Sequence, residues 1–283
     1  KGEGLGNQFL ANIRECDAIA YVLRCFENDD IIHVAGKVDP IADAEVVETE
    51  LMLADLESLE KRVGGLEKKI RANDKDAKLT LELVNRAKAL LEEGKPARHT
   101  ERAADEEKAF KELQLLTAKP VLYVCNVDES AAATGNEHTK KVEDYAKGHE
   151  ARTVVICAEI EAELAGLDAA DRSDYLSSLG LEEPGLNKLI REGYKLLHLQ
   201  TYFTVGPKEA RAWTIPVGTK APQAAGVIHT DFERGFIRAQ TIAYDDFVSF
   251  GGEVAAKEAG KARDEGKEYV VKDGDVMLFK FNT

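Results

Sequence analysis

The apolar residues of the first 200 positions include three short, continuous runs that are typical of buried strands. These runs lie within residues 17–26, at residues 121–125 and within residues 152–157. Runs this short that are apolar at both odd and even positions suit a parallel sheet covered on both faces. Amphipathic helical patterns follow at residues 139–150 and 167–199. The pattern therefore predicts a parallel sheet whose strands are joined by helical crossovers.

Residues 46–116 have helical rather than strand spacing of their apolar positions. Steps of four and three residues form a heptad seam flanked by Glu, Lys and Arg. Asn73 and Asp74 interrupt this seam, and a second apolar stripe ends at Gly94 and Pro96. We therefore expect two long helices in an antiparallel hairpin. The seam positions are Met52, Leu56, Leu59, Val63, Leu66 and Ile70 in the first helix and Leu79, Leu83, Ala87 and Leu90 in the second.

Residues 201–282 have short alternating patterns separated by Gly and Asp-Gly turns, which predict a separate module of strands. One helix is expected over residues 244–265, and a few strands around one helix form a β-grasp arrangement. His229 and Asp231 are interpreted as fixing a strand-to-helix turn rather than as a catalytic pair. The segments predicted as strands are YFTVG, RAWTIPVG, GVIHTDF, FIRAQTI and YVVKDGDVMLFKF.

Composition indicates a soluble globular protein of two or three domains. The chain has 283 residues, of which 44% are hydrophobic and 32% charged. The longest apolar runs are far below the ~18 residues of a membrane-spanning helix, and no signal peptide pattern opens the chain. The four cysteines lack C-x-x-C spacing and are expected to be reduced thiols of a cytoplasmic protein. They are Cys16, Cys25, Cys125 and Cys157.

The net charge of −14 argues against strong electrostatic binding to bare nucleic acid. From residue 201 onward, however, the chain has 11 Lys and Arg and 12 Asp and Glu. This part is therefore nearly neutral and can present a local basic face. The six histidines are dispersed without metal-ligand spacing, which disfavours a metalloenzyme. The cations best placed for the basic face are Arg211, Lys220, Arg234 and Arg238.

A polar tetrad, Asn126-Val127-Asp128-Glu129, follows the central apolar run. The carboxyl ends of strands in open α/β sheets bind ligands, and an Asn amide can both donate to and accept from a purine edge. Guanine-specific P-loop proteins carry Asn-Lys-x-Asp here, so Val127 and Glu129 weaken the case for guanine. By itself, the tetrad also fits a strand-end turn followed by a helix N-cap.

The tetrad and the segment FENDDIIHV at residues 26–34 resemble the YchF, or Obg-like ATPase, subfamily of the translation-factor-class P-loop NTPases. Residues 225–239 and 271–276 resemble the TGS domain of threonyl-tRNA synthetases, stringent-response synthetases and some GTPases. The resemblance implies an α/β P-loop NTPase domain, incomplete at its N-terminus, with an inserted α-helical coiled-coil hairpin and a C-terminal β-grasp (TGS) domain. The implied ranges are 1–45 and 118–199 for the NTPase domain, 46–117 for the coiled-coil insertion and 200–283 for the TGS domain.

The resemblance also implies a function. It implies a ribosome-associated, ATP-preferring enzyme that hydrolyses ATP, and GTP weakly, with Mg²⁺, and regulates translation or stress responses. We expect a cytoplasmic monomer that contacts rRNA or tRNA through the TGS domain and the helical arm. His33 would position the attacking water, and the ligands of Mg²⁺ would lie in an N-terminal part. The implied base pocket consists of Asn126, Val127, Glu129, Cys157 and Ala158.

The chain contains no Walker A sequence, G-x-x-x-x-G-K-[ST]. Residue 1 is Lys and the only methionines are Met52 and Met277, so we expect the natural chain to begin upstream, with its P-loop and switch there. Residues 1–10 are then a glycine loop that leads into a short helix at residues 7–14. A chain without its P-loop would neither hydrolyse nor tightly bind nucleotide. The alternative function is therefore a non-catalytic RNA- or ribosome-binding module.

Overall fold

The computed structural model describes residues 6–33 and 36–282. The chain divides into two compact units, Lys1–Leu196 and Leu197–Thr283. Of the predicted N-terminal glycine loop, only Gly6 lies among the described residues. The short helix expected after it is confirmed as α1 (Asn7–Glu15). No helix of the described residues is long and apolar enough to cross a membrane.

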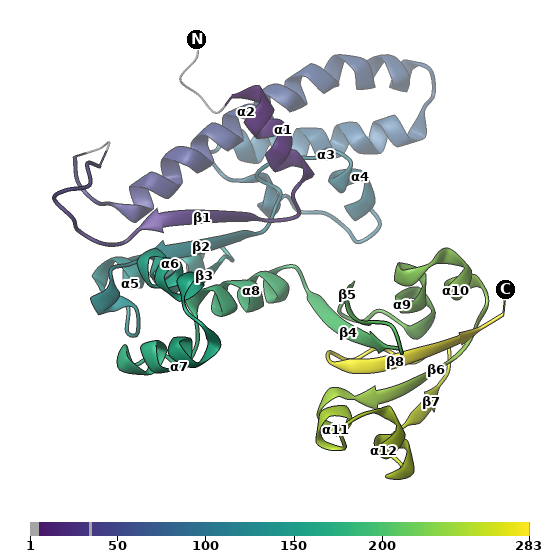
Figure 1. Cartoon of the computed structure of the whole chain (residues 1–283). Coiled ribbons are helices and arrows are strands. Elements are labelled where there is room, and N and C mark those ends of the chain that lie inside the picture. Colours follow the sequence, from purple (N-terminus) through teal and green to yellow (C-terminus); the bar gives the residue numbers. More distant parts are fainter. Residues whose placement is uncertain (1–5, 34–35, 283) are drawn as a thin grey trace. The chain divides into compact units, whose positions relative to one another are not determined.

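The first unit contains a three-stranded sheet in the order β1-β2-β3 (Figure 1). Its strands are β1 (Ile19–Arg24), β2 (Val121–Asn126) and β3 (Arg152–Ile156). Both strand pairs are parallel, as predicted. Residues 121–125 of β2 are buried without exception, which confirms the expectation of a central strand covered on both faces.

Helices cover the two faces of this sheet unequally. On one face, Tyr21 and Tyr123 pack in a core that also takes side chains from α2, α5, α6 and α7. On the other face, α8 packs against β2 and β3, and Val22 of β1 is 69% exposed. These helices are α2 (Pro40–Arg71), α5 (Glu137–Gly148), α6 (Ala158–Gly166), α7 (Ala169–Ser178) and α8 (Gly185–Leu196).

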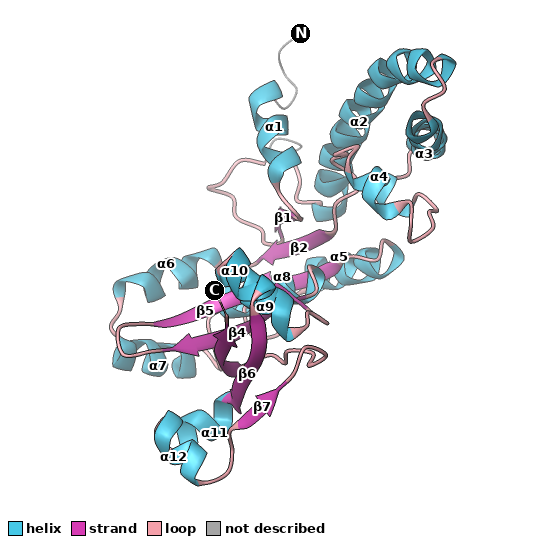
Figure 2. Ribbon diagram, turned by 90° about the vertical axis from the view of Figure 1, so that its right-hand side faces the viewer, coloured by secondary structure: helices cyan, strands magenta, loops and turns pink. Residues whose placement is uncertain are grey.

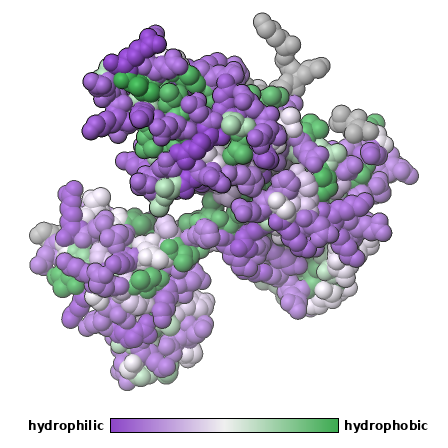
Figure 3. Space-filling view, turned by 180° about the vertical axis from the view of Figure 1, so that it is seen from behind, coloured by the Kyte–Doolittle hydropathy of each residue, from purple (hydrophilic) through white to green (hydrophobic). Residues whose placement is uncertain are grey.

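The predicted helical hairpin is confirmed as α2 and α3 (Lys75–Glu92), which pack against each other and are called the helical arm below. The helix α2 begins earlier than its heptad seam, at Pro40, because Asp39 caps it by accepting a hydrogen bond from the Ala42 N–H at 3.3 Å. Leu59 and Leu83 are fully buried in the seam. In the view from behind, the apolar seam shows as a green strip between hydrophilic flanks (Figure 3).

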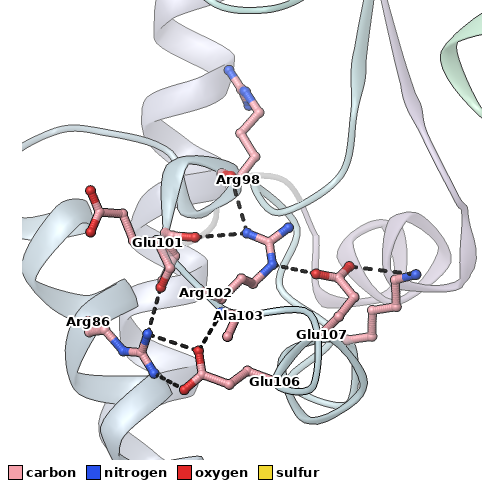
Figure 4. A network of polar contacts seen from close by, with 9 residues as sticks. Arg86, Arg98, Glu101, Arg102, Ala103, Glu106 and Glu107 are labelled. Atoms are coloured by element: carbon pink, nitrogen blue, oxygen red, sulfur yellow. Dashed lines mark hydrogen bonds and ion pairs between the residues drawn. The ribbon is translucent and has the colours of Figure 1, made fainter.

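A polar network holds the segment after α3 against that helix (Figure 4). The Arg86 guanidinium donates to both carboxylate oxygens of Glu106, at 2.6 and 3.1 Å, and to the Glu101 carbonyl at 2.7 Å. Next to it, Arg102 donates to Glu107 at 2.6 Å. Bidentate pairs of this kind fix orientation as well as distance. The segment contains η1 (Ala97–His99) and α4 (Glu107–Lys111).

A buried carboxylate fixes the base of the helical arm to the loop before β2. Asp55 of α2 is fully buried and accepts hydrogen bonds from the backbone N–H groups of Leu116 and Thr117 and from the Thr117 hydroxyl, each at 2.8 Å. Arg14 of α1 lies 3.8 Å from the same carboxylate. Asp55 therefore links three segments that are distant in sequence.

The second unit contains a five-stranded mixed sheet in the order β5-β4-β8-β6-β7 (Figure 1), and strands are magenta in Figure 2. The pair β4 and β8 is parallel and the other pairs are antiparallel. Tyr202, Ile215 and Phe279 are core residues that face α9. The strands are β4 (Leu199–Val205), β5 (Ala210–Pro216), β6 (Phe236–Ala243), β7 (Arg263–Glu265) and β8 (Asp275–Phe281).

The predicted strand GVIHTDF is wrong. Its residues belong to two helices, α9 (Ala221–Ile228) and α10 (Thr230–Arg234), with His229 between them. The alanines of α9 are fully buried on the sheet, so helical packing of small residues overrides the local strand pattern. His229 does fix a turn, since its Nδ1 accepts from the Asp231 N–H at 3.2 Å, but the turn joins two helices.

The single helix predicted over residues 244–265 is also wrong. Two short helices, α11 (Tyr244–Ser249) and α12 (Glu253–Glu258), occupy its first part, and β7 occupies its end. Gly251 and Gly252 separate the helices with φ values of 75° and 132°. Such values suit glycine and end an α-helix.

Candidate functional site

The carboxyl ends of the three parallel strands meet at one edge of the first unit's sheet (Figure 1). Arg24 of β1 is in register with Asn126 of β2, which is in register with Ile156 of β3. The polar segments that follow these strands therefore begin side by side. This edge is where open α/β sheets bind ligands.

Asn126 is tied to the segment after β3. Its Oδ1 accepts a hydrogen bond from the Ala158 N–H at 2.9 Å. The Val127 N–H also donates to the Ile156 carbonyl at 2.9 Å, so two hydrogen bonds join the segments that follow β2 and β3. Because a backbone N–H can only donate, the Asn126 oxygen must face Ala158. The Nδ2 amide of this side chain is a donor that can bind a ligand, and Oδ1 keeps a second lone pair.

The other residues of the predicted base pocket differ in which of their groups can contact a ligand. The Val127 side chain is buried in the core, so only its backbone can face a ligand. Cys157 is buried as well and directly precedes α6. Glu129 is exposed at the start of η2 (Glu129–Ala131). Asp128 has a structural role, since its Oδ1 caps this short helix by accepting from the Ala131 N–H at 3.0 Å.

Two buried thiols lie behind this edge. Cys25, directly after β1, and Cys125 of β2 are fully buried free thiols. A hydrogen bond with Cys25 and burial both raise the pKa of the Cys125 thiol, which keeps it protonated. In α7, a hydrogen bond to the Glu163 carboxylate raises the pKa of Tyr175 to about 12. Cys125 and Tyr175 therefore stay uncharged near neutral pH.

The loop after β1 is shaped by Arg24, which sequence reasoning missed. Its guanidinium donates to the carbonyls of Phe26, Asn28 and Ile31 at 3.1, 3.0 and 2.8 Å. Asn136, the N-cap of α5, holds the start of the loop by donating to the Cys25 carbonyl at 2.6 Å. The only sequence signal for Arg24 is a cation at the last position of a buried strand.

His33 lies at the end of this loop, next to the start of α2. Its Nε2 is 2.9 Å from Oδ2 of Asp43, in the first turn of that helix. The exposed fractions of the two side chains are 14% for His33 and 35% for Asp43. Residues 34–35, which follow, lie outside the described residues. Sequence reasoning missed Asp43 because an acid in a first helical turn is ordinary.

The four cations predicted to form a basic face of the second unit do not share one face of its sheet. Arg211 stacks over Trp213, 4.1 Å from the ring centroid, on the face that α9 covers. Arg238 is in register with Lys280 on the opposite face and lies 3.4 Å from Asp264. Lys220 donates to Glu268 at 2.6 Å, and Arg234 is exposed at the end of α10.

A metal-ion site is not formed by the residues that the structure describes. Within residues 6–33 and 36–282, no group of three or more His, Cys, Asp or Glu side chains is placed to hold a metal ion.

The fold and the edge together define the class of the first unit. It is an open parallel α/β sheet with its candidate ligand site at the carboxyl ends of the strands. A family model described as YchF-GTPase_C, a protein of unknown function (DUF933), matches residues 199–282.

Relatives match the whole chain. It is 55% identical over 282 residues to the ribosome-binding ATPase YchF of Escherichia coli O157:H7, covering 100% of this chain and 77% of that protein. It is 52% identical over 284 residues to the protein of the same name from Bacillus subtilis, covering 78% of it. The solved Schizosaccharomyces pombe YchF GTPase aligns with a TM-score of 0.83 at 35% identity, over 99% of this chain and 76% of that one. The chain belongs to the YchF family.

Proposed function

We propose that this chain is part of a ribosome-binding ATPase that hydrolyses ATP, and GTP weakly, and regulates translation or stress responses in the cytoplasm as a monomer. Relatives that carry the name ribosome-binding ATPase match the chain over its full length, which supports this proposal. The TGS assignment of the second unit and the P-loop are parts of the same proposal.

The hydrogen bond between Asn126 and Ala158 is the observation that carries the nucleotide proposal. With Oδ1 turned toward Ala158, Asn126 offers its Nδ2 donor to an acceptor such as N7 of a purine. Backbone around Val127 and at Cys157-Ala158 would flank the base. Because both adenine and guanine present N7, Asn126 favours purines without choosing between them. Glu129 is the residue that we propose disfavours guanine.

His33 would orient the attacking water. The water oxygen forms a bond to the γ-phosphorus while the bond from phosphorus to the β–γ bridging oxygen breaks, leaving its electron pair on ADP. One water proton stays on the released hydrogen phosphate, and the other leaves through the hydrogen-bonded imidazole to solvent. Phosphoryl transfer is catalysed mainly by positioning and electrostatics, so a residue that orients the attacking water has a large effect.

Mg²⁺ would neutralise developing phosphate charge in such a reaction. The described residues do not fit a magnesium site, since they contain no suitable cluster of ligands. We therefore assign its ligands to the N-terminal part proposed to hold the P-loop. No step above depends on their geometry.

The second unit would contribute to ribosome contact through its cations, together with the helical arm. Arg211 stacked on Trp213 presents a planar cation and an aromatic ring together, a combination that binds RNA bases and phosphates. Lys220 and Arg238 already face carboxylates. Arg211 and Arg234 are therefore the stronger candidates of the four.

Replacement of His33 tests the enzymatic proposal in the full-length protein. We expect His33→Ala to lower ATP turnover by about 100-fold or more, because a positioned acceptor contributes 10²–10⁴-fold. ATP binding should be retained, since His33 is not part of the base pocket. Steady-state hydrolysis and equilibrium binding of a fluorescent ATP analogue measure the two effects.

His149→Ala is the matched control, because His149 lies between α5 and the start of β3, at the opposite end of the strands. Its turnover should equal that of the unsubstituted protein. Unchanged turnover in His33→Ala would contradict the role of His33. A full-length protein that binds no ATP at all would favour the non-catalytic ribosome-binding module.

A further inference from the structure

We propose that Arg24 is a positioning residue for ATP hydrolysis: its guanidinium holds the loop after β1 in the shape that presents His33 to the site. This inference rests on the proposed role of His33. It adds a residue that acts through the backbone of the loop rather than on the substrate. The observation that carries it is a set of three hydrogen bonds from this one side chain to three carbonyls of the loop, at 2.8, 3.0 and 3.1 Å.

The connection from β1 to α2 depends on side chains for its shape. Its described residues, 25–33 and 36–39, contain no helix or strand. Connections of more than about 12 residues without secondary structure are uncommon in compact domains, and many of them are functional. The backbone groups of such a segment lack the regular partners of a helix or strand, and ordering it costs conformational entropy. Other contacts must therefore select one conformation.

The start of this loop is fixed to the sheet. The Cys25 N–H donates to the Asn126 carbonyl at 2.8 Å and continues the pairing of β1 with β2. The Cys25 carbonyl accepts a hydrogen bond from Nδ2 of Asn136, the N-cap of α5, at 2.6 Å. Cys25 itself is fully buried. The loop therefore leaves β1 from a fixed point beside Asn126.

Strand geometry explains why Arg24 can reach the loop. Successive side chains of a strand point to opposite faces, and Leu23 points into the core, so Arg24 lies on the other face. Val22 lies on that same face and is 69% exposed. This face leaves the Arg24 side chain room to turn toward residues 26–31.

Each of the three hydrogen bonds uses a different nitrogen of the guanidinium. Nε donates to the Phe26 carbonyl, Nη2 to that of Asn28 and Nη1 to that of Ile31. A guanidinium is planar and its donors point in fixed directions, so three carbonyls that bind it are held in one mutual arrangement. Cζ of Arg24 also lies 4.9 Å from the centroid of the Phe26 ring. An ammonium group could not replace this fork, because it is a compact charge.

The last of these carbonyls links Arg24 to His33. Ile31 precedes His33 by two positions, so a fixed Ile31 carbonyl restricts where the histidine can lie. On the other side of His33 lies the start of α2, where Asp43 Oδ2 is 2.9 Å from His33 Nε2. A displacement of about 1 Å at a reacting group can lower a rate by about 100-fold. Arg24 can therefore affect turnover through the loop alone.

Arg24→Gln and Arg24→Lys in the full-length protein test the proposal. Gln removes the planar fork and its charge, whereas Lys removes the fork and keeps the charge. We expect kcat for ATP to fall about 10- to 100-fold in both variants. KM should change by less than about threefold, because the contact of Asn126 with Ala158 does not involve Arg24. Full activity of Arg24→Lys would overturn the proposal, since charge without the fork would then be sufficient.

Hydrogen exchange measures the loop directly and does not depend on enzymatic activity. In Arg24→Gln, the amides of residues 26–33 should exchange about tenfold faster or more, because hydrogen bonds to a charged group no longer hold the loop. Residues 51–66 of the helical arm should exchange as in the unsubstituted protein. Unchanged exchange at residues 26–33 would overturn the proposal. Faster exchange at both segments would overturn it too, because a general loss of stability would then explain the lower kcat.

Arg172→Gln is the matched control. Arg172 is exposed on α7, and its Nε also donates to a backbone carbonyl, that of Leu167, at 2.9 Å. The substitution removes the same charge and the same kind of hydrogen bond from a different segment, so its kcat should be unchanged. Equal losses of kcat in Arg172→Gln and Arg24→Gln would contradict a specific role of Arg24.

A double substitution separates this inference from the proposed function. If Arg24 acts through His33, His33→Ala with Arg24→Gln should be no slower than His33→Ala alone. A further loss in the double variant overturns this route. Full activity of Arg24→Gln beside an inactive His33→Ala overturns the role of Arg24 and leaves that of His33. Full activity of His33→Ala overturns the role of His33 itself, and with it the route proposed for Arg24.

Discussion

Asn126 shows how one hydrogen bond changes what a side chain can recognise. The side-chain amide of an Asn can both donate and accept hydrogen bonds. The sequence alone therefore predicts that Asn126 could distinguish adenine from guanine. In the folded chain, the Ala158 N–H uses one lone pair of its oxygen, and we propose that the Nδ2 donor is the group that contacts a base. A single donor binds features that both purines share. Discrimination must then come from other groups, among which Glu129 is exposed at the same edge.

Asn126→Ala tests this view at the residue scale. We expect ATP and GTP to lose affinity together, by about tenfold each, because one hydrogen bond of about 1.4 kcal/mol is removed from both complexes. The ratio of the two affinities should stay the same. Competition against a fluorescent nucleotide in the full-length protein measures both affinities.

Asn187→Ala on α8 provides the control, since Asn187 is exposed and lies on a helix that covers the opposite face of the sheet from α6. Its affinities should match those of the unsubstituted protein. A large drop for ATP with GTP unaffected would show that Asn126 does select the base.

At the scale of elements, the helical arm depends on buried polar contacts at its base as much as on its apolar seam. Burial raises the pKa of Asp55, while hydrogen bonds from Thr117 and Leu116 oppose that shift. The cost of burying this carboxylate is offset only when all of its partners are present. Asp55 thus makes the docking of α2 against the loop before β2 specific.

Asp55→Ala should therefore destabilise the protein by about 3 kcal/mol, since it leaves the N–H groups of Leu116 and Thr117 buried without an acceptor. Urea unfolding followed by circular dichroism measures the change, with two transitions analysed separately if the two units unfold independently. Glu50→Ala, an exposed acid on the same helix, should unfold as the unsubstituted protein does. Equal stability of both variants would show that Asp55 does not hold the arm.

At the scale of the whole molecule, charge is distributed unevenly along the chain. The net charge is −14, but residues 201–283 carry 11 Lys and Arg against 12 Asp and Glu. A molecule this acidic is repelled by rRNA at long range, so attachment to a ribosome requires a local cationic surface. The C-terminal unit is the part where repulsion is smallest.

Charge reversal tests that expectation. Arg211→Glu combined with Arg234→Glu should lower co-sedimentation with ribosomes by about tenfold or more at moderate salt and make the remaining binding less sensitive to salt, because fewer phosphates are neutralised. The same two-site reversal at Lys257 and Lys267, exposed cations of the same unit, is the control. Equal losses in both proteins would indicate a general charge effect rather than a contact by Arg211 and Arg234.

The sequence by itself determined the elements whose pattern is repeated and local. The three strands were predictable because short continuous apolar runs are typical of a parallel sheet, although only β2 is buried on both faces and Val22 of β1 is 69% exposed. The hairpin was predictable because its seam repeats over several helical turns. The polar ends of the strands identified the candidate ligand edge, since parallel strands align their carboxyl ends.

Tertiary structure decided the features that depend on partners distant in the chain. Asn126 meets Ala158 across 32 positions, and Asp55 meets Thr117 across 62, so neither pairing leaves a local signal. His33 and Asp43 are only ten positions apart, yet their contact depends on where α2 begins relative to the loop that Arg24 shapes. In the same way, residues 226–228 are helical because the sheet of the second unit buries the alanines of α9. The local pattern of apolar residues predicts which positions are buried. Hydrogen-bond partners, and packing that overrides local propensity, are determined only when the chain has folded.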